Sequence, residues 1–193
     1  MKKRIIAAMD GTRFSKGTID YAVRLAKLSG SEITAIFLHD IRYLSMTYSY
    51  VWDQPFIDFA TIAEIEAEDA EKIARNVALF TNECKTQNVV FTVKKEKGIP
   101  INELLRESTY ADVIIADENL SFYSLSDANP SPFVKDLLAE SRCPVLIVPM
   151  NYEYFDKVIF CYDGSPSSTY AMKQFSYLFA ELEDMEAVVV SVN

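Results

Sequence analysis

The sequence predicts an α/β fold in which a doubly wound, five-stranded parallel β-sheet carries helices on both faces. Two observations predict it: apolar runs of strand length alternate with segments of helical periodicity, and Gly, Pro or cap residues separate them. The five apolar runs lie at residues 5–9, 33–38, 89–93, 113–116 and 145–148. Because parallel neighbours need a crossover connection, this alternation implies right-handed β–α–β units.

The segments between these runs carry the marks of helices. Ser15 is an N-cap and Gly30 a C-terminal stop for a helix whose apolar residues recur at i, i+3, i+4 and i+7. An apolar stripe between residues 62 and 84 predicts a long helix, and residues 101–109 predict a short one. The pair Ser131-Pro132 predicts the start of a further helix.

Composition and charge exclude several classes of partner. The 193 residues include 28 acidic and 19 basic ones, a net charge of −9, so the chain repels nucleic acid phosphates and anionic lipid surfaces. Cys84, Cys143 and Cys161 show no paired spacing, which argues against a disulfide framework and a zinc site. No apolar run reaches the roughly 18 residues of a membrane-spanning helix, and the N-terminal run is too short for a signal peptide. We expect a cytoplasmic protein that binds neither nucleic acid nor a membrane.

The C-terminal part of the chain repeats its beginning. Asp163-Gly164-Ser165 aligns with Asp10-Gly11-Thr12 at an offset of 153, and the alignment continues without a gap to residues 188–190, which fall on 35–37. The sequence therefore predicts a first domain at residues 1–150, a linker at 151–156 and a partial second copy, strand–helix–strand, at 157–193. Because so short a copy cannot bury a core of its own, we expect it to be part of a longer chain or to be completed by a partner.

In this order the segments resemble the universal stress protein family, in particular its tandem-domain type. The resemblance rests on the strand into Asp10-Gly11-Thr12, the turn Gly98-Ile99-Pro100, and residues 111–115 and 143–149. It implies the strand order 3-2-1-4-5 and a homodimer, or a pairing of two domains, through the edge strand Val145–Val148. It also implies, for one branch of the family, ATP bound beyond the carboxyl ends of the strands.

The resemblance places a ligand cleft at these strand ends. The candidate ligand-binding residues are Asp10, Gly11, Asp40, Ala116, Asp117 and Ser131. The ATP-binding branch has a glycine-rich phosphate loop after the fourth strand, but here Asp117 and Leu120 occupy its first two glycine positions and Ser131-Pro132 its final Gly-Ser pair. Because a carboxylate repels a triphosphate and proline has no N–H, we expect no cofactor in the first domain, with ATP as the alternative.

Other chemistries have less support. A divalent cation could be held by four carboxylates, those of Asp10, Asp40, Asp117 and Glu118, but solvated strand ends are the favoured interpretation. His39, the only histidine, closes a buried strand and is expected to be structural, and Cys143 is expected to be a packed thiol. The sequence contains no P-loop, CxxC or HExxH motif.

Residues 41–60 contain six aromatic side chains that follow no single period. They are Tyr43, Tyr48, Tyr50, Trp52, Phe56 and Phe59. Two interpretations stay open, a docking surface or lid over the cleft and an extension of the local core.

The sequence thus predicts a non-enzymatic stress-response or regulatory protein that binds an unknown protein partner or a small ligand and has a degenerate nucleotide site. The alternative is a universal stress protein that binds ATP and hydrolyses it slowly. An unrelated α/β enzyme or flavin-binding domain has no supporting motif.

Overall fold

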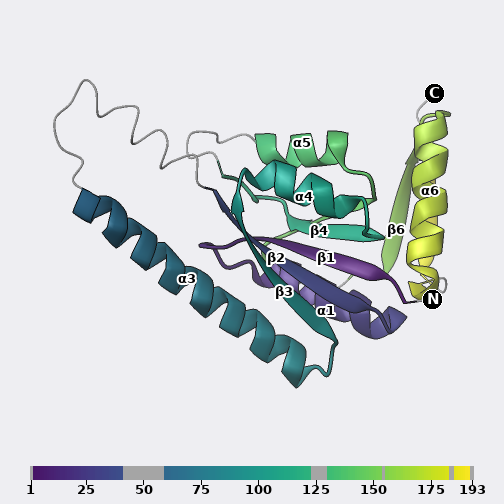
Figure 1. Ribbon diagram of the computed structural model, residues 1–193. Coiled ribbons are helices and arrows are strands. Elements are labelled where there is room, and N and C mark those ends of the chain that lie inside the picture. The colour runs from purple at the N-terminus through teal and green to yellow at the C-terminus, as the bar shows by residue number, and fades with distance from the viewer. Residues whose placement is uncertain (1, 41–58, 123–129, 154, 183–184, 192–193) are drawn as a thin grey trace.

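The computed structural model describes residues 2–40, 59–122, 130–153, 155–182 and 185–191 (Figure 1). The elements of the first unit are β1 (Arg4–Asp10), α1 (Lys16–Ser29), β2 (Glu32–Asp40), α3 (Phe59–Thr86), β3 (Phe91–Gly98), α4 (Pro100–Ser108), β4 (Val113–Asp117), α5 (Pro132–Glu140) and β5 (Val145–Val148). The elements of the second unit are β6 (Lys157–Tyr162), α6 (Pro166–Leu178), a 3-10 turn (Ala180–Leu182) and β7 (Glu186–Ser191). The aromatic segment at residues 43–59, for which a docking surface or lid and an extension of the core were both open, lies almost entirely outside the described residues.

The first unit contains one parallel sheet in the order β3-β2-β1-β4-β5. The central strand β1 pairs with β2 on one side and with β4 on the other, and β5 pairs with β4. This confirms the predicted fold class and strand order.

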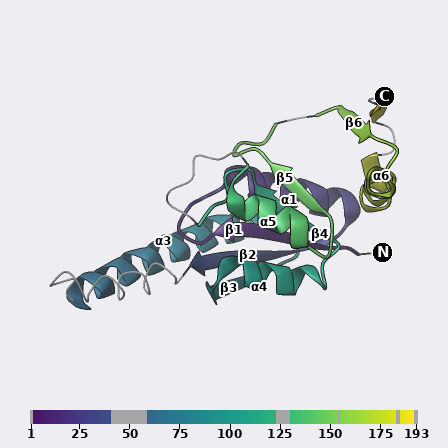
Figure 2. The ribbon, with the colours of Figure 1, turned by 90° about the horizontal axis from the view of Figure 1, so that it is seen from above.

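Helices cover the sheet on both faces (Figure 2). On one face Ile5, Ala7 and Met9 of β1 pack with α1 and with Phe80 of α3. On the other face Ile6 and Ala8 pack with α4 and α5. Because side chains alternate along a strand, a continuous apolar run in β1 supplies both layers of the core, as predicted. No helix in the described parts of the chain is long and apolar enough to cross a membrane.

The third strand differs from its prediction. Residues 89–93 were expected, but β3 spans Phe91–Gly98 and includes the charged stretch from Lys94 to Lys97. β3 pairs only with β2 and so forms one edge of the described sheet. Charged side chains are tolerated at an edge because one side of the strand faces solvent, so an apolar run underestimates its length.

A cluster of ion pairs joins α4 to the sheet. Glu107 of α4, whose side chain is 11% exposed, receives bonds from Arg4 Nη2 at 2.7 Å and Lys94 Nζ at 2.6 Å. Burial acts to raise the pKa of Glu107, but these two cations outweigh it and hold the pKa below its usual value. The carboxylate therefore ties α4 to β1 and β3.

The second unit repeats the turn of the first but starts its helix earlier. Thr12 N donates to Asp10 Oδ1 at 2.8 Å, and Ser165 N donates to Asp163 Oδ1 at 2.9 Å, the same Asx turn in both copies. However, the N-cap of α1 is Ser15 as predicted, whereas the N-cap of α6 is Ser165, the counterpart of Thr12. Pro166, at the first helical position, favours this early start because its φ is already helical.

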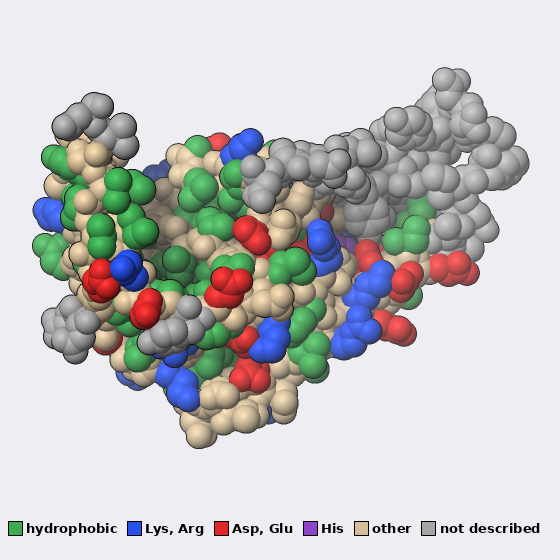
Figure 3. Space-filling view, turned by 180° about the vertical axis from the view of Figure 1, so that it is seen from behind, with side chains coloured by type: hydrophobic (Ala, Val, Ile, Leu, Met, Phe, Trp, Pro, Cys, Tyr) green, Lys and Arg blue, Asp and Glu red, His purple; other side chains and the backbone are tan. Residues whose placement is uncertain are grey.

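The ungapped alignment of the two copies is wrong by one residue in its last part. Ile5 is paired with Ile33 in the first copy, and Val158 is paired with Ala187 in the second. The offset is therefore 153 in the first strand and 154 in the second. The extra residue therefore lies in the connection between β6 and β7, which contains α6 and the 3-10 turn. Hydrophobic side chains gather on the surface of this unit (Figure 3).

The segment that joins the two units packs on α1. Tyr21 Oη donates to the carbonyl of Glu153 at 2.9 Å, and the Tyr21 ring lies 4.8 Å from that of Tyr152 and 6.3 Å from that of Phe155. The aromatic residues of this segment thus extend the core between α1 and the second unit. The division of the chain into two domains and a linker stays a prediction.

Candidate functional site

A small cleft lies at the carboxyl ends of β1 and β4, where α/β sheets bind their ligands. Its volume is about 30 Å³. It is lined by Ala8, Met9, Asp10, Arg13, Phe14, Ser15, Asp117, Asn119, Leu120, Ser121 and Met150. Sites for small molecules usually measure about 300–1,000 Å³, so this cleft holds at most a water molecule or two.

A buried carboxylate closes the cleft. Asp117, 5% exposed, accepts a bond from Ser15 Oγ at 2.7 Å through Oδ2 and one from the Asn119 N–H at 2.7 Å through Oδ1. Ser15 also caps α1 by accepting from the Thr18 N–H at 3.3 Å. One pair of side chains thus joins the start of α1 to the end of β4 across the cleft.

The second carboxylate of the cleft belongs to Asp10. Its Oδ1 accepts from the N–H of Thr12 and, at 2.9 Å, from the Thr12 hydroxyl. Burial raises the pKa of Asp10, although the Thr12 bonds and the charge of Arg13 act in the opposite direction. Burial therefore outweighs the hydrogen bonds of the turn, and the surroundings of Asp10 disfavour its charge.

Gly11 is fixed between β2 and α3. Its N–H donates to the Leu38 carbonyl at 2.7 Å, and its carbonyl accepts from Asn76 Nδ2 at 2.8 Å. A Cβ at this position would lie 2.9 Å from Ile73 Cγ1 and 3.0 Å from the Leu38 oxygen, so only glycine fits without movement. Gly11 therefore fixes the turn against β2 and α3 and is not among the residues that line the cleft.

The chain after β5 crosses the start of α1. The Gly17 N–H donates to the Met150 carbonyl at 2.7 Å, and a Cβ on Gly17 would lie 1.9 Å from the Pro149 oxygen. This crossing brings Met150 to the wall of the cleft. The sequence prediction missed Met150, because nothing in the pattern around residues 149–150 indicates a close approach to Gly17, which lies 150 − 17 = 133 residues earlier in the chain.

The structure brings together two of the six predicted site residues, Asp10 and Asp117. Ala116 is fully buried in the sheet, and Asp40 ends β2 opposite Gly98. Ser131, 4% exposed, caps α5 by accepting from the Val134 N–H at 3.1 Å, and its hydroxyl donates to the Leu120 carbonyl at 2.5 Å. Ser131 therefore has a structural role, because its hydroxyl proton is already donated to the Leu120 carbonyl and is not available to a phosphate.

Asn76 is a further residue that the sequence prediction missed. It is 2% exposed and supplies the bond that holds the Gly11 carbonyl. A polar residue between Ile73 and Val77 on the apolar stripe of α3 is the signal that could have indicated it, because a buried amide needs a fixed partner.

Two further groups that were considered as candidates for chemistry, His39 and Cys143, have the following surroundings. His39 Nε2 lies 3.4 Å from Asp69 Oδ2 of α3 and so bridges β2 to that helix. Burial raises the pKa of the Cys143 thiol. Among the described residues, no group of three or more His, Cys, Asp or Glu side chains is placed to hold a metal ion.

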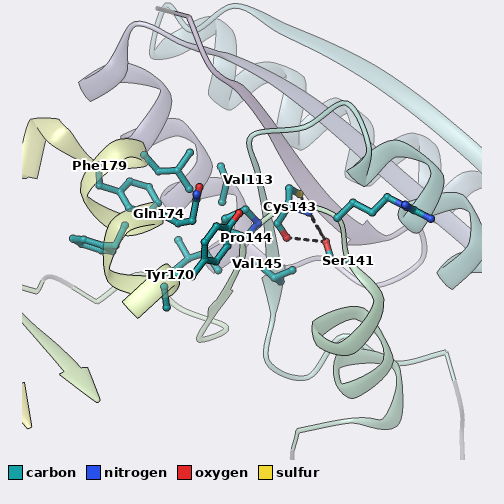
Figure 4. Close-up of a pocket in the computed structure, with 13 residues that line it drawn as sticks. Val113, Ser141, Cys143, Pro144, Val145, Tyr170, Gln174 and Phe179 are labelled. Carbon is teal, nitrogen blue, oxygen red and sulfur yellow. Dashed lines mark hydrogen bonds between the residues drawn. The ribbon is translucent and has the colours of Figure 1, made fainter. Parts of the chain in front are cut away.

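A larger cavity lies at the opposite, amino ends of β4 and β5 (Figure 4). It measures about 450 Å³ and lies between the segment Ser141–Leu146 and α6, with Tyr170 and Gln174 of α6 facing Pro144 and Val113. Ligands of open α/β sheets bind at the carboxyl ends of the strands, so this space is better described as an imperfectly filled contact between the two units.

Comparison with known proteins identifies the fold. No protein-family model matches the sequence, and no curated protein matches it. Among solved structures, a universal stress protein from Archaeoglobus fulgidus has a TM-score of 0.64 at 17% identity; the match covers 99% of this chain and 66% of that one. UspA from Lactobacillus plantarum has a TM-score of 0.54 at 13% identity, over 76% of this chain and 97% of its own. A universal stress protein family member from Burkholderia pseudomallei has a TM-score of 0.52 at 19% identity, over 76% and 96%. The chain therefore has the universal stress protein fold.

Proposed function

We propose that this chain is a cytoplasmic universal stress protein that acts by binding a protein partner, without catalysis, and whose first unit has a closed nucleotide cleft. The observation that supports the proposal is the bond between Ser15 Oγ and Asp117 Oδ2 at 2.7 Å across a cleft of about 30 Å³. A nucleotide could enter only after this bond is broken and Leu120, which is 5% exposed, is moved out of the core.

Electrostatics add to this obstacle. Among the described residues that line the cleft, two carry carboxyl groups, Asp10 and Asp117, and one is a cation, Arg13. A triphosphate carries several negative charges and needs N–H donors or cations around it. Pro132 has no N–H to offer at the start of α5, where relatives of the ATP-binding branch are expected to supply one.

A calorimetric titration of the chain with Mg-ATP tests the closed cleft. We expect no binding heat up to millimolar nucleotide. Micromolar binding by the wild-type chain that Asp10→Ala abolishes would place ATP in the cleft and refute the proposal. Binding that is equal in both proteins would place ATP elsewhere on the chain and leave the closed cleft standing.

The partner contact that we propose is the free edge of β5. Among the described residues β5 pairs only with β4, so the outer edge of Val145–Val148 presents unpaired N–H and C=O groups. Such an edge can pair with the same strand of a second copy or with a second domain.

Sedimentation equilibrium tests this contact. We expect the wild-type chain to be a dimer and Ile147→Pro to be a monomer. Residues 144 and 148 turn their main-chain groups toward β4, so the N–H of Ile147 lies on the outer edge, where proline removes it and blocks close strand pairing. Leu138→Ser, a change at a side chain of α5 that is 51% exposed, is the control and should leave the dimer intact. An Ile147→Pro protein that is folded by circular dichroism and still dimeric would refute the contact.

ATP binding remains the second candidate function because of one observation. Asp10, which relatives are expected to place near the nucleotide, keeps its position in the cleft even though burial disfavours its charge. Ionisable groups held at such a cost are frequent at functional sites. The titration above decides between the two candidates.

A further inference from the structure

A groove lies between the later turns of α1 and the last turns of α3. It measures about 350 Å³, which is within the usual range of small-molecule sites. It is lined by Asp20, Val23, Arg24, Lys27, Leu28, Glu83, Gln87 and Tyr152. None of these residues lines the cleft closed by Asp117 or the cavity beside α6, so the groove is a separate feature of the first unit and the segment that follows it.

In this groove one amide separates a cation from a carboxylate. Lys27 Nζ donates to Gln87 Oε1 at 2.9 Å, and Gln87 Nε2 donates to Glu83 Oε1 at 3.1 Å. Among the described residues, neither Lys27 nor Glu83 forms an ion pair. An ammonium group has three donors and a carboxylate has several acceptor positions, so both charged groups keep the capacity to bind a ligand.

The other two charged residues of the groove have partners of their own. Asp20 forms an ion pair with Lys16, one turn earlier in α1. The guanidinium carbon of Arg24 lies 5.8 Å from the centroid of the Tyr152 ring, a cation–π contact. Lys27 and Glu83 are therefore the charges that the groove offers to a ligand, one of each sign.

The groove also offers apolar surface and an unsatisfied hydroxyl. Val23 is 6% exposed, and Leu28 is 42% exposed. The hydroxyl oxygen of Tyr152 is buried and has no hydrogen-bond partner among the described residues. Buried polar atoms are rarely left without a partner in proteins, which favours a bound polar group at this end of the groove.

We propose that this groove binds a small zwitterion with an aliphatic body, of the class of the aliphatic α-amino acids. The ligand carboxylate pairs with Lys27, the ligand ammonium group pairs with Glu83, and the aliphatic body lies against Val23 and Leu28. The amide of Gln87 already shows the required pattern, since one carbon carries an acceptor that faces Lys27 and a donor that faces Glu83. An α-amino acid carries the same two functions close together, each with a full charge.

A ligand with a single charge suits the groove less well. A carboxylate alone leaves Glu83 without a partner, and an amine alone leaves Lys27 without one. A zwitterion uses both charged groups and adds no net charge to the groove. The site is independent of the closed cleft and of the edge of β5, so the proposal does not rest on the proposed function.

Titration of the full chain with L-leucine, followed by the NMR shifts of backbone amides, tests the site. We expect saturable shifts at Lys27, Glu83 and Gln87 with a Kd of about 1 mM, because exposed ion pairs contribute little each. Isocaproate is leucine without its ammonium group, and isoamylamine is leucine without its carboxylate. Each should bind about fivefold more weakly than leucine, since each loses one ion pair.

Matched variants assign the two charges. Lys27→Gln and Glu83→Gln should each weaken leucine binding about fivefold, and Lys27→Glu should make isoamylamine bind more tightly than leucine. Lys85→Gln, at an exposed cation of the last turn of α3 outside the groove, is the control and should change nothing. Absence of saturable shifts up to about 20 mM leucine would overturn the proposal. So would leucine binding that Lys27→Gln and Glu83→Gln leave unchanged, or that Asp10→Ala abolishes, because the ligand would then lie outside the groove or in the cleft.

Discussion

The bond between Ser15 and Asp117 should contribute measurably to the stability of the first unit. A hydrogen bond to a charged group contributes about 1.5–3 kcal/mol, and this one, at 2.7 Å, joins a half-buried hydroxyl to a carboxylate that is 5% exposed. Ser15→Ala should therefore cost about 2–3 kcal/mol, of which about 1 kcal/mol is the lost cap of α1. Asp117→Ala should cost a similar amount because the Asn119 N–H also loses its acceptor.

A double-mutant cycle separates the bond from these other effects. Urea unfolding followed by circular dichroism should give a coupling free energy of about 1–2 kcal/mol between Ser15→Ala and Asp117→Ala. The control cycle pairs Asp117→Ala with Ser165→Ala, which removes the equivalent cap of α6 without a contact to Asp117 and should be additive. If the Ser15 cycle were additive to within about 0.5 kcal/mol, the two side chains would not be bonded, and the closed cleft would lose its main support.

Three further predictions follow from close contacts and charges. Gly17→Ala should lower the free energy of unfolding by about 3 kcal/mol or more, because its Cβ would lie 1.9 Å from the Pro149 carbonyl oxygen. Gly98→Ala, whose Cβ would lie 3.2 Å from the flexible Glu103 side chain, should lower it by less than about 1 kcal/mol. Urea midpoints compare the two variants, and equal losses would refute the crossing of the chain over α1. Glu107→Gln should lower the free energy of unfolding by about 1–2 kcal/mol at pH 7. Because the folded pKa of Glu107 is lowered, this loss should shrink as pH falls below about 4.5. A loss that stayed constant down to about pH 3 would contradict the prediction. Asp10→Asn should lower the free energy of unfolding at pH 7 by less than about 1 kcal/mol, or raise it. The reason is that the folded pKa of Asp10 is raised, so its ionisation above about pH 4 opposes folding. A loss above about 2 kcal/mol would show that the carboxylate is structural.

The sequence was sufficient for the fold because its main signals are local. The apolar run before Asp10, the cap Ser15 and the stop Gly30 each act within one element, and together they predict a parallel sheet with crossover helices. The errors arose where neighbouring strands and connections determine the structure. β3 is longer than its apolar run because it lies at an edge, and the ungapped alignment of the two copies is wrong by one residue in the last strand.

The site was harder to predict because long-range contacts define it. Asp117 was correctly placed at a strand end, but its bond to Ser15, 102 residues away, is what closes the cleft. Ser15 was recognised only for its local role as a helix cap. The crossing at Gly17 and the amide of Asn76 likewise depend on segments that meet only in the folded chain.

The two copies of the Asx turn show how far local sequence determines chemistry. In both, an N–H two residues later donates to the carboxylate at nearly the same distance, 2.8 Å for Asp10 and 2.9 Å for Asp163. However, burial raises the pKa of Asp10, whereas hydrogen bonds from Ser165 lower the pKa of the exposed Asp163 to about 2. The same motif therefore has opposite electrostatic character in the two units, because the surrounding elements determine the degree of burial and the sequence of the turn determines only its shape.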